Sequence, residues 1–218
     1  DGSKVYVANS SVVTVINTAT NTVATTISGF SSAYGIAVNP AGTFAYVADI
    51  GSASVKVINV PTNTVTATIP TTSGGIEVAV NPAGNRAYLT QSGSNAVAVL
   101  DLVSNTQLTT VPVGSLPYGV SFTPDGTRAY VGNGGGSVVS VINTATNTTL
   151  SPITVGSSPY SFGNTFVTGS TGCSGNPKTF TITVNPTPTV NAVTSQVVCN
   201  NSATTAVNFS SPTTGGTI

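Results

Sequence analysis

Short runs of alternating apolar and polar residues, separated by turn signals, fill the first three quarters of the chain. Residues 54–59 and 64–69 both alternate with a period of two, which is typical of β-strands that bury one face. Turn residues punctuate these runs, as in Asn39-Pro40-Ala41-Gly42, where Pro at the second position and Gly at the fourth favour a type I turn. No segment has a helical period of useful length. The pattern therefore predicts many short strands and no helices.

The alternating pattern recurs along the chain at a fixed interval. Four tyrosines at one place in the pattern are 40, 42 and 42 residues apart, at Tyr6, Tyr46, Tyr88 and Tyr130. Triplets of the Val-Ile-Asn type follow at steps of 42, beginning at Val15, Val57, Val99 and Val141. A third landmark has the same step and begins at Tyr34, Ile76, Tyr118 and Tyr160. Three landmarks with one period predict a repeat of about 42 residues that contains four short strands.

Four strands in each unit of about 40 residues predict an all-β fold, a β-propeller in which each repeat is one blade. A blade is an antiparallel sheet that buries its faces by stacking on its neighbours. The expected blades are residues 1–29 completed by 158–166, then 31–70, 75–112 and 117–154. The absence of helices excludes a TIM barrel. A β-sandwich is the structural alternative, although sandwich strands do not usually repeat in sequence.

The repeats resemble the YVTN family of β-propeller repeats in Tyr46-Val47-Ala48-Asp49, Val57-Ile58-Asn59, Thr62-Asn63-Thr64 and Pro117-Tyr118-Gly119-Val120. The resemblance covers residues 1–166. That family is best known from surface-layer proteins of archaea and from bacterial cell-surface proteins, and it usually forms larger rings, often of seven blades. This sequence departs from the pattern at Ile76-Glu77, where the other repeats have Tyr-Gly. Because Asp1 falls inside a repeat, we expect the chain to be an excerpt of a longer protein.

The character of the sequence changes after Phe166, where a linker rich in Gly, Ser and Thr begins. Residues 172–184 resemble the last strand of the PKD-like, immunoglobulin-type modules of large surface proteins of Bacteroidota, and residues 196–209 resemble the opening strands of the next module. Neither module is complete. We therefore expect two regions, 1–166 and 167–218, of which the second is a partial β segment that cannot form a sandwich from its own strands.

Cys173 and Cys199 are the only cysteines, and both lie in this second region. An extracellular setting favours a disulfide. A direct Cys173–Cys199 bond is one possibility. The resemblance implies another, in which each cysteine pairs within its own module and its partner lies outside this chain.

Composition narrows the classes of function. Charged residues make up only 5% of the 218 residues, and Lys+Arg 5 balances Asp+Glu 5. There is thus no net charge to attract nucleic acid or an anionic membrane, and no apolar run is long enough to insert into a bilayer. The absence of His removes His-based triads and the usual zinc sites. We expect no cofactor, no metal and no catalysis.

Few residues remain as candidates for a site. Glu77 falls on the expected innermost strand, so it is either a channel carboxylate that binds a cation or a sugar hydroxyl, or a solvated channel residue without a ligand. Tyr34, Tyr118 and Tyr160 recur near the expected channel mouth and are possible ligand contacts. We interpret the four recurring tyrosines as packing between repeats. Turn or cap roles are expected for the acids Asp49, Asp101 and Asp125.

Together these features predict a non-enzymatic extracellular protein of a bacterial or archaeal cell surface, used for adhesion, scaffolding or surface-layer assembly. Its expected partners are other surface proteins or glycans, with self-association through open strand edges as a further possibility. One alternative is a carbohydrate- or peptide-binding module. Another is a propeller enzyme of the lyase type whose site lies in blades missing from this chain.

Overall fold

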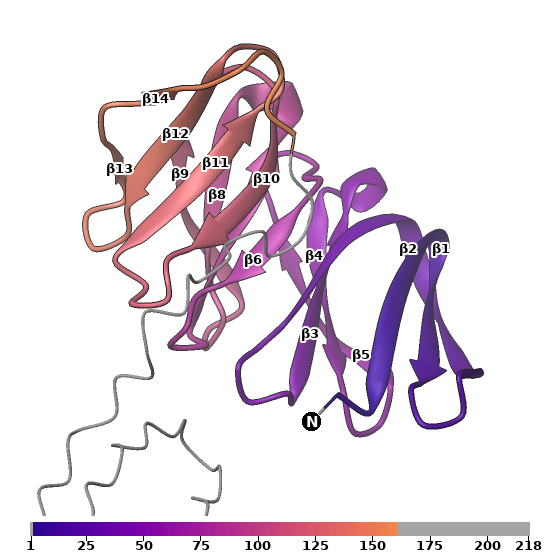
Figure 1. Cartoon of the computed structure of the whole chain (residues 1–218). Helices are drawn as coiled ribbons and strands as arrows, with labels where there is room; N and C mark the ends of the chain where they lie inside the picture. Colours follow the sequence, from indigo (N-terminus) through magenta and orange to yellow (C-terminus); the bar gives the residue numbers. More distant parts are fainter. Residues whose placement is uncertain (1, 161–218) are drawn as a thin grey trace, which may run out of the picture. The chain divides into compact units, whose positions relative to one another are not determined.

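A computed structural model of the chain describes residues 2–160, which belong to the first of two units, Asp1–Phe166. The second unit, Val167–Ile218, lies outside the described residues, and so do Cys173, Cys199 and the expected closing segment from residue 161 onward. The described part is almost entirely antiparallel β-structure in three sheets (Figure 1). None of its helices is long and apolar enough to cross a membrane.

The three sheets follow one another in the chain. The first has the order β1 (Lys4–Asn17), β2 (Thr22–Val38), β3 (Phe44–Asp49), β4 (Ser54–Asn59) and β5 (Thr64–Pro70). The second has the order β6 (Val78–Val80), β7 (Arg86–Gln91), β8 (Ala96–Asp101) and β9 (Thr106–Pro112). The third has β10 (Pro117–Phe122), β11 (Arg128–Asn133), β12 (Val138–Asn143), β13 (Thr148–Thr149) and β14 (Ile153–Thr154). Two single-turn 3₁₀ helices, η1 (Ile50–Ser52) and η2 (Ser92–Ser94), lead into β4 and β8.

Four strands for each repeat, as predicted, are found in the second to fourth repeats. The second repeat consists of the last part of β2 and of β3, β4 and β5. β4 and β5 begin at the first residues of the predicted runs 54–59 and 64–69, whereas the first strand of this repeat is continuous with β2, which begins at Thr22. In the fourth repeat the last strand is split into β13 and β14, which both pair with β12. Pro152 lies between the two pieces, and because proline has no backbone N–H it cannot continue the ladder.

The first sheet contains five strands because it joins the first repeat to the second. β1 folds back on itself at Ser10, which has φ 52°, so that the N–H of Thr18 donates to the carbonyl oxygen of Ser3 at 3.1 Å. β2 pairs with the second half of β1 over its own first half and with β3 over its last residues. Gly29, with φ 98°, lies between these two parts. The first repeat thus contributes three strands and passes directly into the first strand of the second repeat.

The Pro-Gly turns have the predicted type I hydrogen bond. The N–H of Gly42 donates to the carbonyl oxygen of Asn39 at 2.8 Å, and the same bond recurs at Gly84 and Gly126. Gly42, Gly84 and Gly126 have φ between 69° and 73°, a left-handed conformation that glycine adopts without strain.

Turns of successive repeats also lie against one another. A Cβ atom built on Gly84 would lie 3.5 Å from Cδ of Pro40, and one built on Gly126 would lie 3.3 Å from Cδ of Pro82. The contact recurs in the same register, so these repeats stack at one constant offset.

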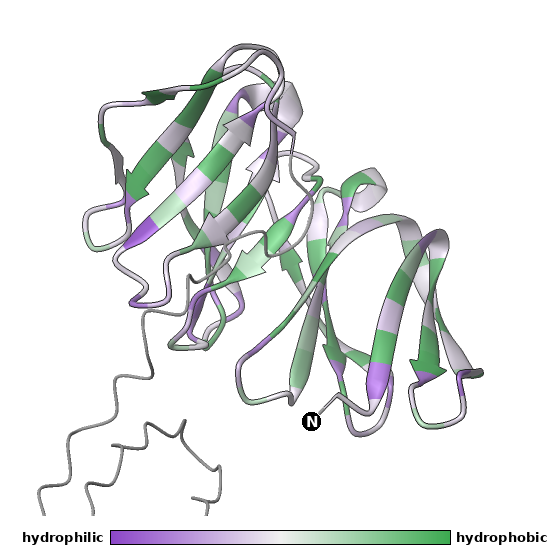
Figure 2. Ribbon diagram, viewed as in Figure 1, coloured by the Kyte–Doolittle hydropathy of each residue, from purple (hydrophilic) through white to green (hydrophobic). Residues whose placement is uncertain are grey.

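Three apolar clusters fill the junctions between consecutive repeats. One joins β1 and β2 to β3 and β4, the next joins β3–β5 to β6–β8, and the third joins β7–β9 to β10–β12. Hydrophobic residues, green in Figure 2, occur along the strands of all three sheets. The outer strand β5 has the predicted alternation, whereas β3 and β7 are buried at five consecutive positions because neighbouring repeats cover both of their faces. Tyr46 and Tyr88 are buried in the second and third clusters, which confirms packing between repeats for these two.

A hydrogen bond supplements the apolar packing at two junctions. The hydroxyl of Tyr88 donates to Oδ1 of Asn147 in the following repeat at 2.8 Å, and the hydroxyl of Tyr6 donates to Oδ1 of Asn63 at 2.9 Å. The Tyr88 ring also packs on Phe122, with ring centroids 4.7 Å apart.

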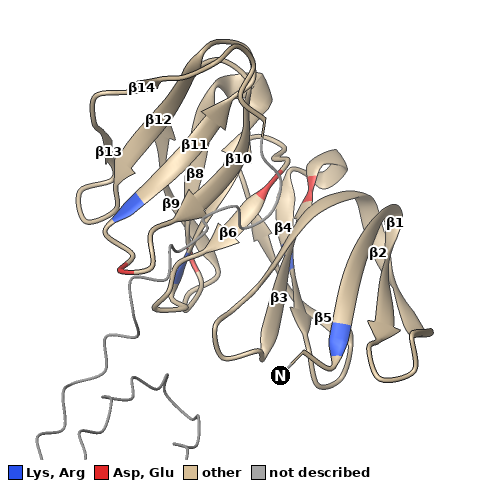
Figure 3. Cartoon of the chain, viewed as in Figure 1, with Lys and Arg blue, Asp and Glu red and all other residues tan. Residues whose placement is uncertain are grey.

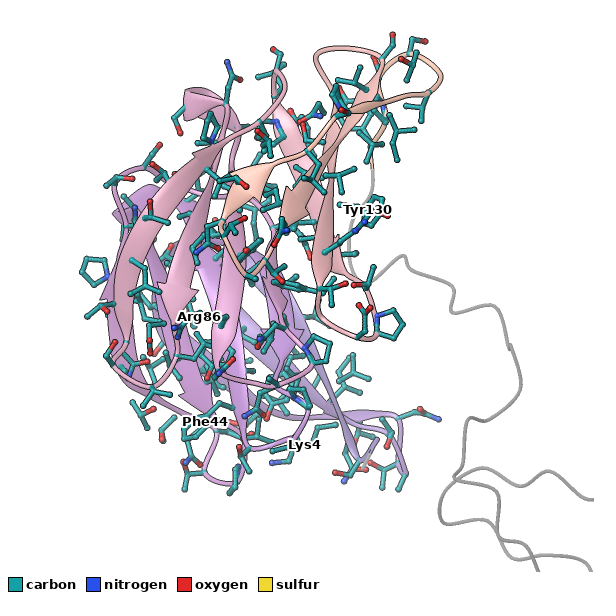
Figure 4. All side chains as sticks on the ribbon, turned by 90° about the vertical axis from the view of Figure 1, so that its left-hand side faces the viewer. Lys4, Phe44, Arg86 and Tyr130 are labelled. Atoms are coloured by element: carbon teal, nitrogen blue, oxygen red, sulfur yellow. The ribbon has the colours of Figure 1, made fainter. Side chains whose placement is uncertain are left out.

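Figure 4 labels Lys4, Phe44 and Arg86, the residues at which β1, β3 and β7 begin. These three strands occupy the same place in successive repeats.

Candidate functional site

The first strand of each repeat, which we call its inner strand, is the last part of β2, then β6 and then β10. The candidate site lies where these inner strands begin. The segments that enter the inner strands meet the segments that join β3 to β4, β7 to β8 and β11 to β12, and we call this side of the sheets the connection face. Backbone hydrogen bonds fix it, for example from Gly134 to Leu116 at 2.9 Å and from Gly135 to Ser115 at 3.0 Å. Of the predicted ligand-contact residues, Tyr34 lies in β2, Tyr118 lies in β10 and Glu77 lies just before β6, whereas Tyr160 follows β14.

Asp49, at the end of β3, is fully buried beneath this face. Its carboxylate accepts hydrogen bonds from the backbone N–H groups of Ser31 and Ser32, at 3.0 and 2.6 Å, and from the hydroxyl of Ser52 at 2.7 Å. Burial opposes ionisation, but these hydrogen bonds together with the charge of Lys56 outweigh it and lower the pKa of Asp49. Asp49 is therefore an ionised cap of the connecting loop, in agreement with the predicted role.

Gln91 and Asn133 occupy the same strand-end position in the next two repeats, and both are fully buried. Nε2 of Gln91 donates to the carbonyl oxygen of Ser73 at 2.7 Å, while Nδ2 of Asn133 donates to the hydroxyl of Ser140 at 2.9 Å. Oε1 of Gln91 and Oδ1 of Asn133 accept no hydrogen bond within residues 2–160. Sequence reasoning missed this recurring position. Its signal was a polar residue three positions after each recurring tyrosine.

Glu77 lies just before β6 and is buried, with 5% of its surface exposed. The alternative of a solvated channel residue is therefore wrong. The physical reason is Gly35 on the adjacent inner strand, where a Cβ atom would lie 2.7 Å from Oε2 of Glu77. The N–H of Gly35 also donates to the carbonyl oxygen of Ile76 at 2.9 Å. The missing side chain of Gly35 provides the space for the Glu77 carboxylate.

Thr90 links the inner segments of the third and fourth repeats. Its buried hydroxyl donates to the carbonyl oxygen of Tyr118 at 2.7 Å and lies 3.1 Å from the backbone N–H of Glu77, which donates to it. The segments that contain Gly35, Glu77 and Tyr118 are thus neighbours in chain order.

The three candidate tyrosines differ in their surroundings. Tyr34 and Tyr160 are 56% and 55% exposed, whereas Tyr118 is half-buried. Tyr118 and Tyr160 pack edge to face with ring centroids 4.8 Å apart. Both rings rest on Gly134, where a Cβ atom would lie 2.7 Å from the Tyr160 ring and 3.0 Å from the Tyr118 ring. The structure thus brings Tyr118 and Tyr160 together on the connection face.

The other acids have local structural roles. Oδ1 of Asp101 accepts hydrogen bonds from the N–H groups of Ser104 and Val103, at 2.9 and 2.8 Å, and its carboxylate pairs with Arg86. Oδ1 of Asp125 accepts hydrogen bonds from the hydroxyl of Thr123 and from the N–H of Thr127. These bonds, above all from the N–H of Ser104 and the hydroxyl of Thr123, lower the pKa of both carboxyl groups. The predicted turn roles are confirmed.

Charged residues are few and scattered over the three sheets in Figure 3, and Arg86 and Asp101 form an ion pair. Residues 2–160 hold no group of three or more His, Cys, Asp or Glu that could bind a metal. The carboxylate of Asp49 is engaged by three donors, which leaves it a structural anion and not a proton acceptor. What the connection face offers to a ligand is the half-exposed rings and hydroxyls of Tyr34 and Tyr160. Such rings have an apolar body and a polar tip, a combination enriched at binding interfaces.

No protein-family model matches the sequence, and no curated protein matches it. Among solved structures, the chain is similar to hydrazine synthase of Kuenenia stuttgartiensis, with 24% identity and a TM-score of 0.66 over 71% of this chain and 47% of that one. It is also similar to a functionally unknown protein of Desulfotomaculum acetoxidans, with 21% identity and a TM-score of 0.64 over 72% of this chain and 54% of that one.

The matched part thus spans about half the length of each of these two solved chains. Similarity at this level of identity concerns the fold alone, and it agrees with a β-rich architecture of antiparallel sheets.

Proposed function

We propose that the repeats are blades of a β-propeller of the YVTN type, and that the chain is part of a non-enzymatic, extracellular cell-surface protein. The constant offset of the repeats supports the propeller. The stacked Pro-Gly turns and the apolar clusters recur at the same places in successive repeats. Hydrazine synthase, one of the similar structures, is a β-propeller-containing protein.

The proposed role is adhesion to surface glycans or proteins through the connection face. The observation that carries this role is the exposure of Tyr34 and Tyr160. The buried polar side chains nearby, such as Asp49 and Gln91, are instead hydrogen-bonded to the backbone of the connecting segments. Tyr160 is held in place by Tyr118 and by the backbone of Gly134, so little rotational freedom is lost when a ligand covers it. Exposed, pre-ordered aromatic rings of this kind form the energetic centres of binding surfaces.

An array of bacterial and host glycans, followed by titration of the best ligand, tests this role. We expect binding by the wild-type chain, and binding at least about 10-fold weaker for Tyr160→Ala and for Tyr34→Ala. Leu108→Ala is the matched control, because Leu108 is an exposed apolar residue on the outer strand β9. A ligand whose affinity is unchanged in both tyrosine variants contradicts the proposed face.

The alternative proposal is a carbohydrate- or peptide-binding module that acts without adhesion and uses the same tyrosines. The two roles differ in whether the ligand is attached to a cell. An adhesin binds intact cells, and soluble ligand inhibits this binding by occupying the connection face, whereas a module without an adhesive role binds soluble ligand only.

A further inference from the structure

Leu116, at the entry to β10 on the connection face, combines two features that are unfavourable for a leucine. Its backbone is left-handed, with φ 49°, and its side chain is 42% exposed, so it gains little from burial. A left-handed backbone is strained for residues with a side chain, and a bulky apolar residue there is an outlier. Pro117 follows, and a residue before proline favours an extended backbone with negative φ. Stability therefore does not explain a leucine at this position.

The other repeats show what the position requires. The counterparts of Leu116 are small residues, Ser32, Gly74 and Ser158. Ser158 also precedes a proline and has φ 52°, so the same backbone corner recurs without the leucine. A small polar residue thus meets the needs of this corner, and the large side chain of Leu116 is an addition to it.

The corner at Leu116 is held by main-chain hydrogen bonds to two loops. The N–H of Leu116 donates to Oδ1 of Asn95 in the preceding repeat at 2.9 Å, and its carbonyl oxygen accepts from the N–H of Gly134 at 2.9 Å. The segment that follows the fourth repeat reaches Gly134 through the ring of Tyr160. The neighbours of Leu116 on both sides are therefore among the described residues, and they leave its side chain exposed.

Gly134 also brings Leu116 close to the aromatic residues of the connection face. A Cβ atom on Gly134 would lie 3.0 Å from the ring of Tyr118 and 2.7 Å from that of Tyr160. The two rings meet at 60°, so they form a corner instead of a flat platform. A sugar ring stacks its flat C–H face best on a flat platform, because contact falls off steeply with distance. A corner beside a branched aliphatic residue instead fits an apolar side chain of a ligand.

The charge around Leu116 favours a neutral ligand. In the third and fourth repeats, Glu77 is buried, and the other charged residues lie at strand ends or in a turn remote from the connection face: Arg86, Asp101, Asp125 and Arg128. A charged group of a ligand would lose its water at Leu116 without gaining an opposite charge, which is unfavourable.

We propose that Leu116 is a ligand-contact residue of the connection face, and that the ligand is an uncharged protein segment that places an apolar side chain beside Leu116 and Tyr118. Strained residues are found most often at binding and catalytic sites, where function maintains them. This inference rests on the proposed binding role of the connection face, and it names the class of ligand as a protein segment instead of a glycan.

Random peptides displayed on phage, from libraries with and without charged amino acids, test the ligand class on the 218-residue chain, with a glycan array for comparison. We expect the selected peptides to be uncharged and to share an aliphatic or aromatic residue. Leu116→Gly should bind the best peptide at least about 10-fold more weakly. Leu116→Met keeps a long apolar side chain and should bind it nearly as well as the wild-type chain.

The melting temperature distinguishes a ligand contact from a packing role. Leu116→Gly should raise it by about 2 °C, because glycine adopts a positive φ without strain. A side chain needed for packing would lower the melting temperature when removed. Asn21→Gly is the matched control, since Asn21 has φ 52° in an exposed turn between β1 and β2. This control should leave the affinity for the peptide unchanged.

Three results overturn the inference: unchanged peptide binding by Leu116→Gly, a fall in its melting temperature, or a wild-type chain that binds only glycans or charged peptides. Tyr34→Ala separates this inference from the proposed binding role. A ligand that Tyr34→Ala weakens and Leu116→Gly does not would keep the role of the face and refute the role of Leu116. A wild-type chain that binds neither peptides nor glycans would refute both.

Discussion

Oε2 of Glu77 lies 2.7 Å from the point where a side chain on Gly35 would begin, so the two residues share one space on adjacent inner strands. The same Cβ would also lie 2.7 Å from the carbonyl oxygen of Ile76 and 2.8 Å from Cα of Glu77. Only glycine at position 35 permits this close approach of the two strands. The pair explains how a carboxylate is accommodated in a buried position beneath the connection face.

Gly35→Ala should therefore destabilise the fold by about 2 kcal/mol, because the backbone of the next repeat must shift to admit a methyl group. Urea unfolding monitored by circular dichroism measures the change. Gly93→Ala is the control, since a Cβ there meets nothing within 4 Å, and its effect should stay within about 0.5 kcal/mol. Equal effects of the two substitutions would show that the inner strands are not in contact as described.

Asp49→Ala should cost about 2 to 3 kcal/mol, because it leaves the N–H groups of Ser31 and Ser32 without their acceptor. Asp49→Asn should cost less, since Asn133 occupies the equivalent position and an amide oxygen can accept one of these bonds. Because the pKa of Asp49 is lowered in the folded state, its contribution is complete above the ordinary carboxyl pKa and is lost as the pH falls through the folded value.

Urea unfolding at pH 7 and over a series below about pH 4 measures both effects of Asp49. The wild-type chain should lose more stability than Asp49→Asn over this acid range. An identical loss in the two chains would assign the acid sensitivity to other groups.

Tyr88 predicts a second pH dependence, at the alkaline end. Burial raises the pKa of Tyr88 from 10.0 to about 12. Above pH 10 the unfolded chain releases this proton while the folded chain keeps it. The stability is thus fully present below pH 10 and falls as the pH rises to about 12, by up to about 1.4 kcal/mol per pH unit from this group.

Tyr88→Phe measures this contribution, because it removes the titrating hydroxyl together with its bond to Asn147. It should lower stability by about 1 kcal/mol at pH 7. Between pH 10 and 12 it should make the decline shallower. The tyrosinate absorbance of the folded chain reports the titration itself. A decline as steep as that of wild type would mean that Tyr88 is not the group responsible.

The stacked turns can be tested with two glycines of similar φ, 69° at Gly42 and 70° at Gly126. Alanine at either position carries the cost of a left-handed backbone, about 1 to 2 kcal/mol. Gly126→Ala should cost about 0.5 to 1 kcal/mol more, because its Cβ would lie 3.3 Å from Pro82, whereas a Cβ on Gly42 meets nothing within 4 Å. Thermal or urea unfolding of the two variants provides the comparison. Equal costs would mean that successive turns do not touch.

The strands, the turns and their 42-residue register were predictable from the sequence because each depends on local patterns that recur. The strand-end position of Asp49, Gln91 and Asn133 was harder to see, because an acid and two amides of different length share a place but not a chemistry. The burial of Glu77 was not predictable, since it depends on Gly35 in a different repeat.

An experimentally determined structure of the 218-residue chain tests the central claim, that the repeats are propeller blades, most directly. The account predicts that the inner segments around Gly35, Glu77 and Tyr118 lie nearest to one common axis, with successive sheets rotated about it and with each Pro-Gly turn against the next. Sheets stacked as parallel layers, with these segments far apart and without a common axis, would contradict it.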